Sequence, residues 1–410
     1  MEKRINRCIK IYPWYSSFTG DLLFYIAIDT LFLTLVKGFS AAEIVSIYSI
    51  SQLICIGLQF PILFLMKKIG NTASFRTGAL LLLLSAVLTT FGNTYFLVLL
   101  GRVMHDSAAI FKNASVVMLE NNLDMIDRRE DFVRARTSAN TVYSVITMLI
   151  AFVASYMFTL NNYLPMAGCI ACALAGFLLS VLIKDYSSNN KPLHIKKKTR
   201  IKLHYSKFII VTVIAYSVFY AVVSSGQNEG KLFIQEHLFL DFNEDKTALI
   251  LGAIICVTRV VRVISNVIFA KVYRKYQGKM GAILASLLCI SMASMVFGSF
   301  IPQVIVKILV MSFGYTIILF ARDPYNLYTQ DVVFLNTPKE QHETLLVVLN
   351  FGMKIATVGL GLVFSAILLS YPLLVVISIL LIVSVIEIIL SIWLYRVVMT
   401  GKQKKQEAMV

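Results

Sequence analysis

Long apolar runs recur along the whole chain and are separated by mostly short polar connectors. A helix needs about 20 mainly apolar residues to cross the hydrocarbon core of a membrane. Each run of that kind predicts one transmembrane helix. Twelve are present, at about 15–36, 42–66, 75–92, 95–119, 138–159, 163–183, 208–229, 247–270, 280–300, 303–321, 345–369 and 372–396. We therefore expect an all-α polytopic membrane protein with twelve transmembrane helices.

The composition agrees with this pattern. Hydrophobic residues make up 58% of the 410 positions and charged residues only 15%. Soluble domains are typically about 45–50% apolar and about 25% charged. A soluble enzyme and a disordered chain are therefore excluded.

The positive charges follow a topological rule. Lys and Arg gather in both tails and in the connectors after even-numbered runs, as in Lys67, Lys68 and Arg76. Because Lys and Arg stay mainly on the cytoplasmic side of a membrane, we expect both termini in the cytoplasm and a multi-pass protein of the plasma membrane. The net charge of +16 then reflects topology and a weak attraction to membrane lipids with anionic headgroups, and no nucleic-acid partner is needed.

The chain also divides into two halves. Its longest polar stretch predicts a basic cytoplasmic linker at 185–207 between six-helix bundles at 1–184 and 208–410. Six-span halves related by an axis along the membrane normal are typical of one large transporter architecture.

Three short segments carry a more specific resemblance. Segment 37–44 (Lys-Gly-Phe-Ser-Ala-Ala-Glu-Ile) is similar to the entry of the second span in bacterial efflux members of the major facilitator superfamily (MFS). Segment 101–106 (Gly-Arg-Val-Met-His-Asp) is similar to the fourth-span motif of proton-coupled antiporters. Gly70 and Lys68 match part of the family's loop after span two, where Lys67 replaces an Asp. The resemblance implies two pseudo-symmetric bundles, a central cavity lined by spans one, four, seven and ten, and a gating role for Gly70 and Lys68.

Ionisable residues inside the predicted spans are the candidate functional residues, because each costs about 2.5–3.5 kcal/mol at mid-bilayer. Asp29 in span one and Arg102 in span four lie at similar depth, about 13 Å below the outer surface at the helical rise. We expect these two to face each other in the cavity. Asp106, His105 and Asp21 complete a candidate proton-coupling and substrate-binding group. The alternative is a fixed Arg102–Asp106 bridge that only ties span four to a neighbour.

The second half offers a looser counterpart. Glu229 lies in a polar segment, 224–230, whose two glycines predict a kinked or unwound stretch lining a cavity. The alternative is that span seven ends there and leaves Glu229 in water. Arg259 and Arg262, one turn apart in span eight, are candidates to pair with Glu229 or to recognise an anionic group.

Two further features lie in spans ten and twelve. Arg322, Asp323 and Pro324 fall at the end of span ten, where Pro breaks or kinks a helix, so we expect a gate or hinge. Glu387 is isolated in span twelve and is expected to contact a neighbouring helix or a partner.

Together these features favour a secondary transporter that rocks its two halves around a central site. We expect a monomer that exports a small lipophilic or cationic molecule in exchange for protons, with no metal or organic cofactor. Uptake of a small solute by proton symport is an alternative. An intramembrane prenyltransferase-like enzyme is another, because Asp124, Asp127 and Asp131 have the spacing of a Mg²⁺–diphosphate motif.

Overall fold

The protein is described by a computed structural model that covers residues 1–187, 207–338 and 342–407. Within these residues the chain forms helices and no strand. In chain order the elements are α1 (Glu2–Phe18), α2 (Tyr25–Leu31), the π-helical turn η1 (Phe32–Val36), α3 (Ala41–Phe91), α4 (Tyr95–Asp124), α5 (Asp131–Leu160), α6 (Leu164–Leu182), α7 (Lys207–Asp241), α8 (Glu244–Tyr276), the 3₁₀ turn η2 (Gln277–Lys279), α9 (Met280–Ser299), α10 (Val304–Asn336), α11 (His342–Ile367) and α12 (Leu373–Glu407). Most of the predicted linker, 188–206, lies outside the described residues.

Nine helices in the described part of the chain are long and apolar enough to cross a membrane. They are α3 and each helix from α5 to α12, some of them over only part of their length. The expected all-α multi-pass class is confirmed, while the number of twelve spans stays a prediction. Helix α4 is not among the nine, since Arg102, Asp106 and Lys112 interrupt its apolar sequence.

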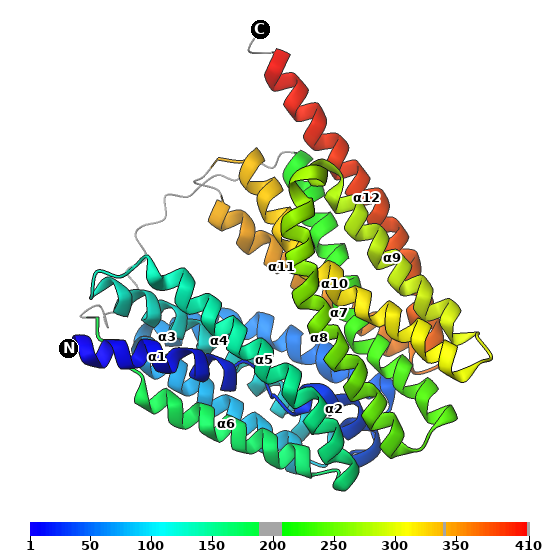
Figure 1. Cartoon of the computed structure of the whole chain (residues 1–410), viewed down its shortest axis with the longest axis horizontal. Helices are drawn as coiled ribbons and strands as arrows, with labels where there is room; N and C mark the ends of the chain where they lie inside the picture. Colours follow the sequence, from blue (N-terminus) through cyan, green and yellow to red (C-terminus); the bar gives the residue numbers. More distant parts are fainter. Residues whose placement is uncertain (188–206, 339–341, 408–410) are drawn as a thin grey trace. The chain divides into compact units, whose positions relative to one another are not determined.

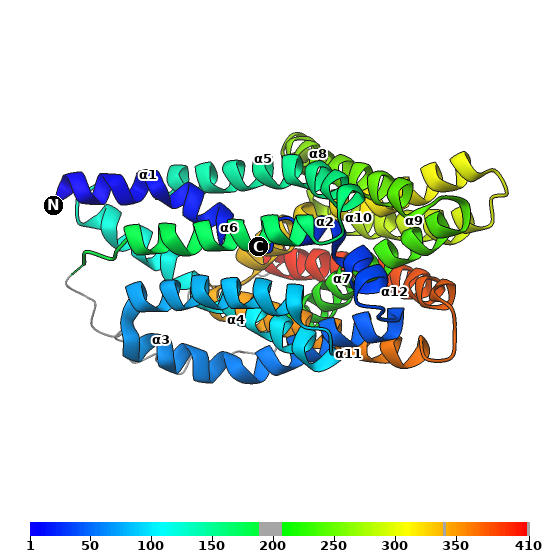
Figure 2. The ribbon, with the colours of Figure 1, turned by 90° about the horizontal axis from the view of Figure 1, so that it is seen from below.

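Helix α3 contains two of the predicted spans and a sharp turn between them. Gly70 adopts φ 80° and ψ 170°, a conformation essentially restricted to glycine. Figure 2 shows α3 doubling back at this turn. The start of α3 is fixed by a capping box, in which Ser40 Oγ accepts from Glu43 N and Glu43 Oε2 accepts from Ser40 N.

The expectation of one continuous first span at 15–36 is wrong. Helix α1 begins at Glu2 and ends at Phe18, and six non-helical residues separate it from α2. Gly20 lies in this break, and a Cβ there would meet Tyr143 Cε2 at 2.7 Å, so that only glycine fits without a shift. Helix ends expose unpaired peptide groups, and side chains supply the partners here: Asp21 Oδ1 accepts from Leu22 N at 2.8 Å.

Several helices also extend past the apolar runs that predicted them. Helix α7 continues to Asp241 and α10 to Asn336, well beyond the expected ends at 229 and 321. Helical hydrogen bonds lie within the backbone and require no apolar side chains, so hydropathy marks the membrane-crossing part of a helix and not its ends.

The described residues divide into two compact units. The first unit is Met1–Lys197 with Glu244–Cys256, and the second is Lys198–Asn243 with Val257–Val410. In the first unit α3 packs on α4, and α1 lies side by side with α5 and α6 (Figure 1). Its core includes Tyr15 and Phe75, whose rings meet edge to face at 5.8 Å.

In the second unit α7 is the central helix. It packs against α10, α11 and α12, and it is buried over more of its apolar length than any of the other eight candidate spans of the described chain. Phe219 of α7 stacks on Tyr325 of α10 with ring centroids 3.6 Å apart. Helix α9 runs beside both α10 and α12.

Candidate functional site

The first unit brings two carboxylates onto one histidine. His105 Nε2 lies 2.8 Å from Asp21 Oδ1, and His105 Nδ1 lies 3.0 Å from Asp106 Oδ1. His105 and Asp106 are largely buried, whereas Asp21 is about one-third exposed. An imidazolium donates from both ring nitrogens, so its cationic form satisfies both carboxylates at once.

Arg102 occupies the next position on the same face of α4. Its Nε lies 3.4 Å from Asp106 Oδ1, and its guanidinium lies 4.9 Å from the ring centre of Tyr48. The Tyr48 hydroxyl donates to Asp29 Oδ2 at 3.1 Å. Tyr48 therefore lies between Arg102 and Asp29, the two residues that were expected to face each other directly.

Asp106 is the most connected member of the group. Besides its contacts with His105 and Arg102, its Oδ2 accepts from Ser51 Oγ at 2.5 Å. Ser51 is fully buried on α3. The i, i+4 bridge between Arg102 and Asp106 is thus one edge of a network that joins α3, α4 and the break after α1.

Helical spacing explains why these side chains meet. Residues 102, 105 and 106 share one face of α4, and Lys112 follows on that face two turns after His105. Lys112 Nζ donates to Ser16 O at 2.7 Å, one of the carbonyls that the end of α1 leaves without a helical partner. The cation thereby stabilises the negative end of the α1 dipole.

A small cavity lined by both polar and apolar side chains adjoins Arg102 and His105. Tyr25, Tyr48 and Ser85 are among its lining residues, and its volume of about 10 Å³ is close to the room that a single water molecule needs. Ser85 Oγ and Arg102 Nε are buried, and neither makes a hydrogen bond within the described residues. The cavity therefore presents polar groups to a water molecule or a small polar group of a ligand, and it has no room for a whole cargo molecule in this conformation.

Four members of this region were not among the predicted site residues: Tyr48, Ser51, Ser85 and Lys112. Lys112 was detectable, because it is a charged residue within the run predicted at 95–119. The other three are uncharged residues in apolar helices, and their polar role follows only from the three-dimensional contacts.

In the second unit Arg262 pairs differently from the expectation. Arg262 forms a two-pronged bridge with Asp323, with Nε–Oδ2 at 2.6 Å and Nη2–Oδ1 at 3.1 Å. Its predicted partner Glu229 is not involved in this bridge. A fork-shaped guanidinium matches a carboxylate better than a single point charge does, and Asp323 supplies that carboxylate from α10. Arg259 lies one turn earlier and is half-buried.

Glu229 is buried inside a continuous helix. The predicted kink or unwinding at 224–230 is wrong, as is the alternative that span seven ends there in water. The glycines serve close packing instead: a Cβ at Gly226 would meet Met292 at 2.8 Å, and one at Gly230 would meet Met295 at 2.8 Å. Glu229 is 3% exposed, and its Oε2 makes no hydrogen bond within the described residues.

The predicted gate on α10 lies within the helix, not at its end. Pro324 is buried inside α10, which continues past it to Asn336. Arg322 Nη1 lies 3.4 Å from Gln227 Oε1, and the Arg322 carbonyl accepts from the Tyr220 hydroxyl at 2.8 Å. These contacts tie α10 to α7.

Glu387 contacts a neighbouring helix. It is fully buried on α12, and its Oε1 accepts from the Tyr325 hydroxyl of α10 at 2.8 Å. Ser391, one turn away on α12, also donates to Oε1, at 3.0 Å.

The loop after span two is held by a residue that the sequence analysis did not single out. Asp185 is 1% exposed, and its Oδ2 accepts from Asn71 at 2.8 Å and from Asn121 at 3.0 Å. Its backbone N–H donates to Thr72. Asp185 thus links the turn of α3, the end of α4 and the segment after α6. Lys68, the predicted gating cation, is exposed two residues before Gly70.

Two of the three acidic residues of the enzyme alternative, Asp124 and Asp131, pair with arginines. Arg129 lies 3.7 Å from Asp124, and Arg128 lies 2.5 Å from Asp131. Within the described residues, no group of three His, Cys, Asp or Glu is placed to hold a metal ion.

Comparison with known proteins gives a family match and several structural neighbours. A family model described as the Major Facilitator Superfamily matches residues 15–351. The nucleoside transporter NupG superposes with a TM-score of 0.73 at 12% identity, covering 96% of this chain and 99% of its own. A bacterial homologue of the iron transporter ferroportin in an inward-facing state gives 0.67 at 13% identity, with 96% and 98% covered. A bacterial homologue of the human lysosomal transporter Spinster gives 0.70 at 10% identity, with 97% and 98% covered. No curated protein matches in sequence.

Proposed function

The chain belongs to the Major Facilitator Superfamily, and from that premise we propose that it exports a small lipophilic or cationic molecule in exchange for protons. Membership in this family makes it a multi-pass membrane transporter, and the prenyltransferase-like enzyme is set aside. The proposal adds twelve spans in two six-helix bundles, cytoplasmic termini, and a monomer that works by alternating access.

One observation carries the proposal: the buried His105 of α4 lies between the carboxylates of Asp21 and Asp106. Helix α4 is otherwise largely apolar. Ionisable residues are costly within a membrane span and are usually functional. Histidine is also the side chain whose unperturbed titration falls nearest to physiological pH.

Proton exchange then follows from hydrogen-bond geometry. When His105 carries two ring protons, it donates to both Asp21 and Asp106. When it loses one proton, it can donate to only one of them, and the other carboxylate loses its imidazole donor and keeps only its remaining partners: Leu22 N for Asp21, and Ser51 and Arg102 for Asp106. A cationic cargo can then take the vacated place, because it offers that carboxylate a positive charge.

Arg102 and Asp29 determine how strongly a cationic cargo is bound beside these carboxylates. Arg102 lies 3.4 Å from the same Asp106 oxygen that faces His105, so it compensates the carboxylate whenever the imidazole is neutral. Asp29 is joined to the group through the Tyr48 hydroxyl and adds a second negative charge for a cation to approach.

The second unit contributes Glu229 as a further protonatable group. Its oxygen Oε2 is buried and lacks a hydrogen-bond partner within the described residues, an arrangement that suits a protonated carboxyl group. Arg259, and Arg262 with its Asp323 bridge, are the cations of this half. Arg322 and Pro324, with Gly70 and Lys68 in the first half, form the proposed gates.

Accumulation of a fluorescent lipophilic cation in pump-deficient cells tests the proposal. Cells with the wild-type chain should retain less dye than empty cells, and a protonophore should abolish the difference. Asp21→Asn and Arg102→Ala, expressed at equal levels, should retain dye as empty cells do. Asp245→Asn is the matched control, because Asp245 is exposed at the start of α8.

The outcomes separate the parts of the proposal. Unchanged dye retention with the wild-type chain would exclude this class of cargo. Reduced retention that both substitutions leave intact would keep export and reject the site. Uptake by proton symport predicts the opposite response to the sign of an imposed pH gradient.

A further inference from the structure

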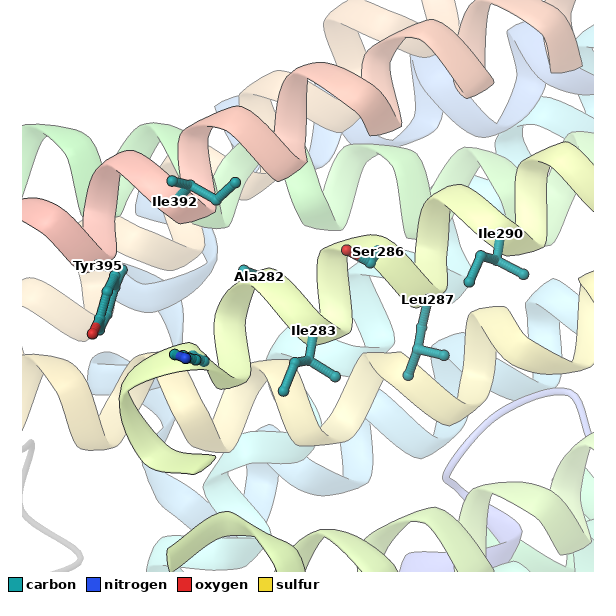
Figure 3. A pocket seen from close by; sticks show the side chains of 8 residues that line it. Ala282, Ile283, Ser286, Leu287, Ile290, Ile392 and Tyr395 are labelled. Carbon is teal, nitrogen blue, oxygen red and sulfur yellow. The ribbon is translucent and has the colours of Figure 1, made fainter. Parts of the chain in front are cut away.

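A long apolar groove runs between α9 and α12 in the second unit. Its volume is about 540 Å³, within the range of about 300–1,000 Å³ that ligand pockets occupy. In Figure 3, Ala282 and Ser286 of α9 lie toward α12, whose Ile392 and Tyr395 border the groove on the other side. Both helices belong to the candidate membrane spans.

Side-chain size explains why the groove exists. Ala282 and Ser286 are one helical turn apart and too small to fill the space between the helices. Ile283 and Ile290 are exposed by 39% and 49% and form the wall beside them. Apart from Ser286, Lys279 and the Tyr395 hydroxyl, the lining is hydrocarbon.

The length of the groove matches one leaflet. Lys279 and Ile290 lie eleven residues apart along η2 and α9, which corresponds to about 16 Å at the helical rise. Half of a bilayer's hydrocarbon core is about 15 Å thick. The groove therefore extends from the membrane interface to the middle of the membrane.

The charge is confined to one end. Among the described residues of the lining Lys279 is the only charged one, and the exposed Lys275 and Arg396 lie close in sequence to Lys279 and Tyr395. Tyrosine at such a position is typical of the interface, where its ring is in hydrocarbon and its hydroxyl meets polar headgroups. A ligand that complements this groove has a hydrocarbon chain and an anionic head.

We infer that this groove binds an anionic phospholipid, with one acyl chain lying along Ala282 and Ser286 and the headgroup phosphate at Lys279 and Tyr395. The lipid belongs to the leaflet on the side of the α12 C-terminus, which the proposed topology makes cytoplasmic. This site is separate from the charged residues proposed for transport.

Native mass spectrometry of the purified full chain tests the inference. The protein is delipidated in detergent and titrated with phosphatidylglycerol or with zwitterionic phosphatidylcholine. We expect a first phosphatidylglycerol to bind at least five times more tightly than a first phosphatidylcholine. Equal affinities would overturn the anionic selectivity.

Two variants locate the bound lipid. Ser286→Trp fills the groove and should weaken the first binding event at least tenfold for both lipids. Lys279→Gln should reduce the preference for phosphatidylglycerol about fivefold and leave phosphatidylcholine unchanged. The controls are Ile382→Trp, at a 61% exposed position of α12 outside the groove, and Lys3→Gln on the exposed N-terminal segment.

A covalent readout guards against a folding defect in Ser286→Trp. Wild-type protein is irradiated with phosphatidylglycerol that carries a diazirine in its acyl chain, and the labelled peptides are mapped. Labels concentrated on 282–290 and around Ile392 support the site. Labels spread evenly over the exposed faces of the other candidate spans, or controls that lose as much lipid as the groove variants, would overturn it.

Discussion

Asp21 and His105 lie 84 positions apart in sequence, yet Asp21 Oδ1 and His105 Nε2 are 2.8 Å apart. Asp21 makes this contact from the non-helical break between α1 and α2. The same histidine meets Asp106 through its other nitrogen. The His105 imidazole therefore links the break after α1 to Asp106 in the middle of α4.

This ring should carry the pH dependence of transport. We expect His105→Asn to lower the proton-driven flux of a reconstituted cargo at least tenfold and to remove the pH dependence that His105 contributes, because asparagine does not titrate. Flux into proteoliposomes under an imposed pH gradient measures both effects. His237→Asn is the matched control and should stay within twofold of wild type; an unchanged pH dependence in His105→Asn would contradict the assignment.

Ser51 should stabilise the protein through Asp106. Ser51→Ala removes the donor to Asp106 Oδ2, and hydrogen bonds to charged groups contribute about 1.5–3 kcal/mol. We expect the free energy of unfolding in detergent to fall by about that amount. Ser49→Ala should cost less than about 1 kcal/mol, because the Ser49 hydroxyl only donates to Val45 O of its own helix. Equal losses in the two variants would show that the hydrogen bond to Asp106 adds no more to the free energy of unfolding than a hydroxyl–backbone bond within one helix.

Gly70 should be irreplaceable for a local backbone reason. At φ 80° and ψ 170°, an added Cβ introduces strain of about 1–3 kcal/mol, so Gly70→Ala should lower the Tm of the purified protein. Gly57→Ala tests the same exchange in the regular part of α3, where a Cβ meets nothing within 4 Å. That control should leave Tm unchanged or raise it, because alanine is favoured over glycine in helices. A Tm for Gly70→Ala at or above wild type would mean that the turn is not needed.

Asp185 should be more important for stability than an exposed acid. Asp185→Ala removes the buried acceptor of the Asn71 amide and the nearer of two acceptors of the Asn121 amide, and we expect a loss of about 3 kcal/mol. Asp131→Ala breaks a more exposed pair with Arg128 and should cost less than about 1 kcal/mol. Reaction of buried cysteines such as Cys8 with a thiol-reactive dye on heating reports unfolding in both variants. Similar midpoints for the two variants would reject the proposed linking role.

Hydropathy predicted the architecture well, because the membrane constrains composition along every span. It located each long apolar helix and placed Gly70 in the connector between two of them. It could not find the break after α1, since Thr19, Gly20 and Asp21 interrupt an apolar run no more strongly than Gly226 and Glu229 do in the unbroken α7. The difference lies in the neighbours, which only the folded chain supplies.

The sequence was sufficient to predict which ionisable residues belong to the candidate site, but not which of them contact each other. Asp21, His105 and Asp106 were recognisable as ionisable residues within spans, and the structure brings them together. The direct Asp29–Arg102 encounter was expected from depth alone, and Tyr48 lies between the two. Arg262 was expected to pair with Glu229 or to recognise an anionic group, and it pairs with Asp323. The rotation of a helix about its axis decides such pairings, and sequence periodicity leaves that rotation undetermined.

Lys112 differs from Arg102 and Arg262, which pair with carboxylates, in what it binds. Its ammonium holds the main-chain carbonyl of Ser16, a group that every amino acid carries. A change at His105 can be offset by a reciprocal change at Asp21, because both partners are encoded side chains. No substitution at position 16 can restore what a neutral residue at position 112 loses. Among related chains with this break after α1, position 112 should therefore vary only between cations, and it should show no covariation with the residue whose carbonyl it holds.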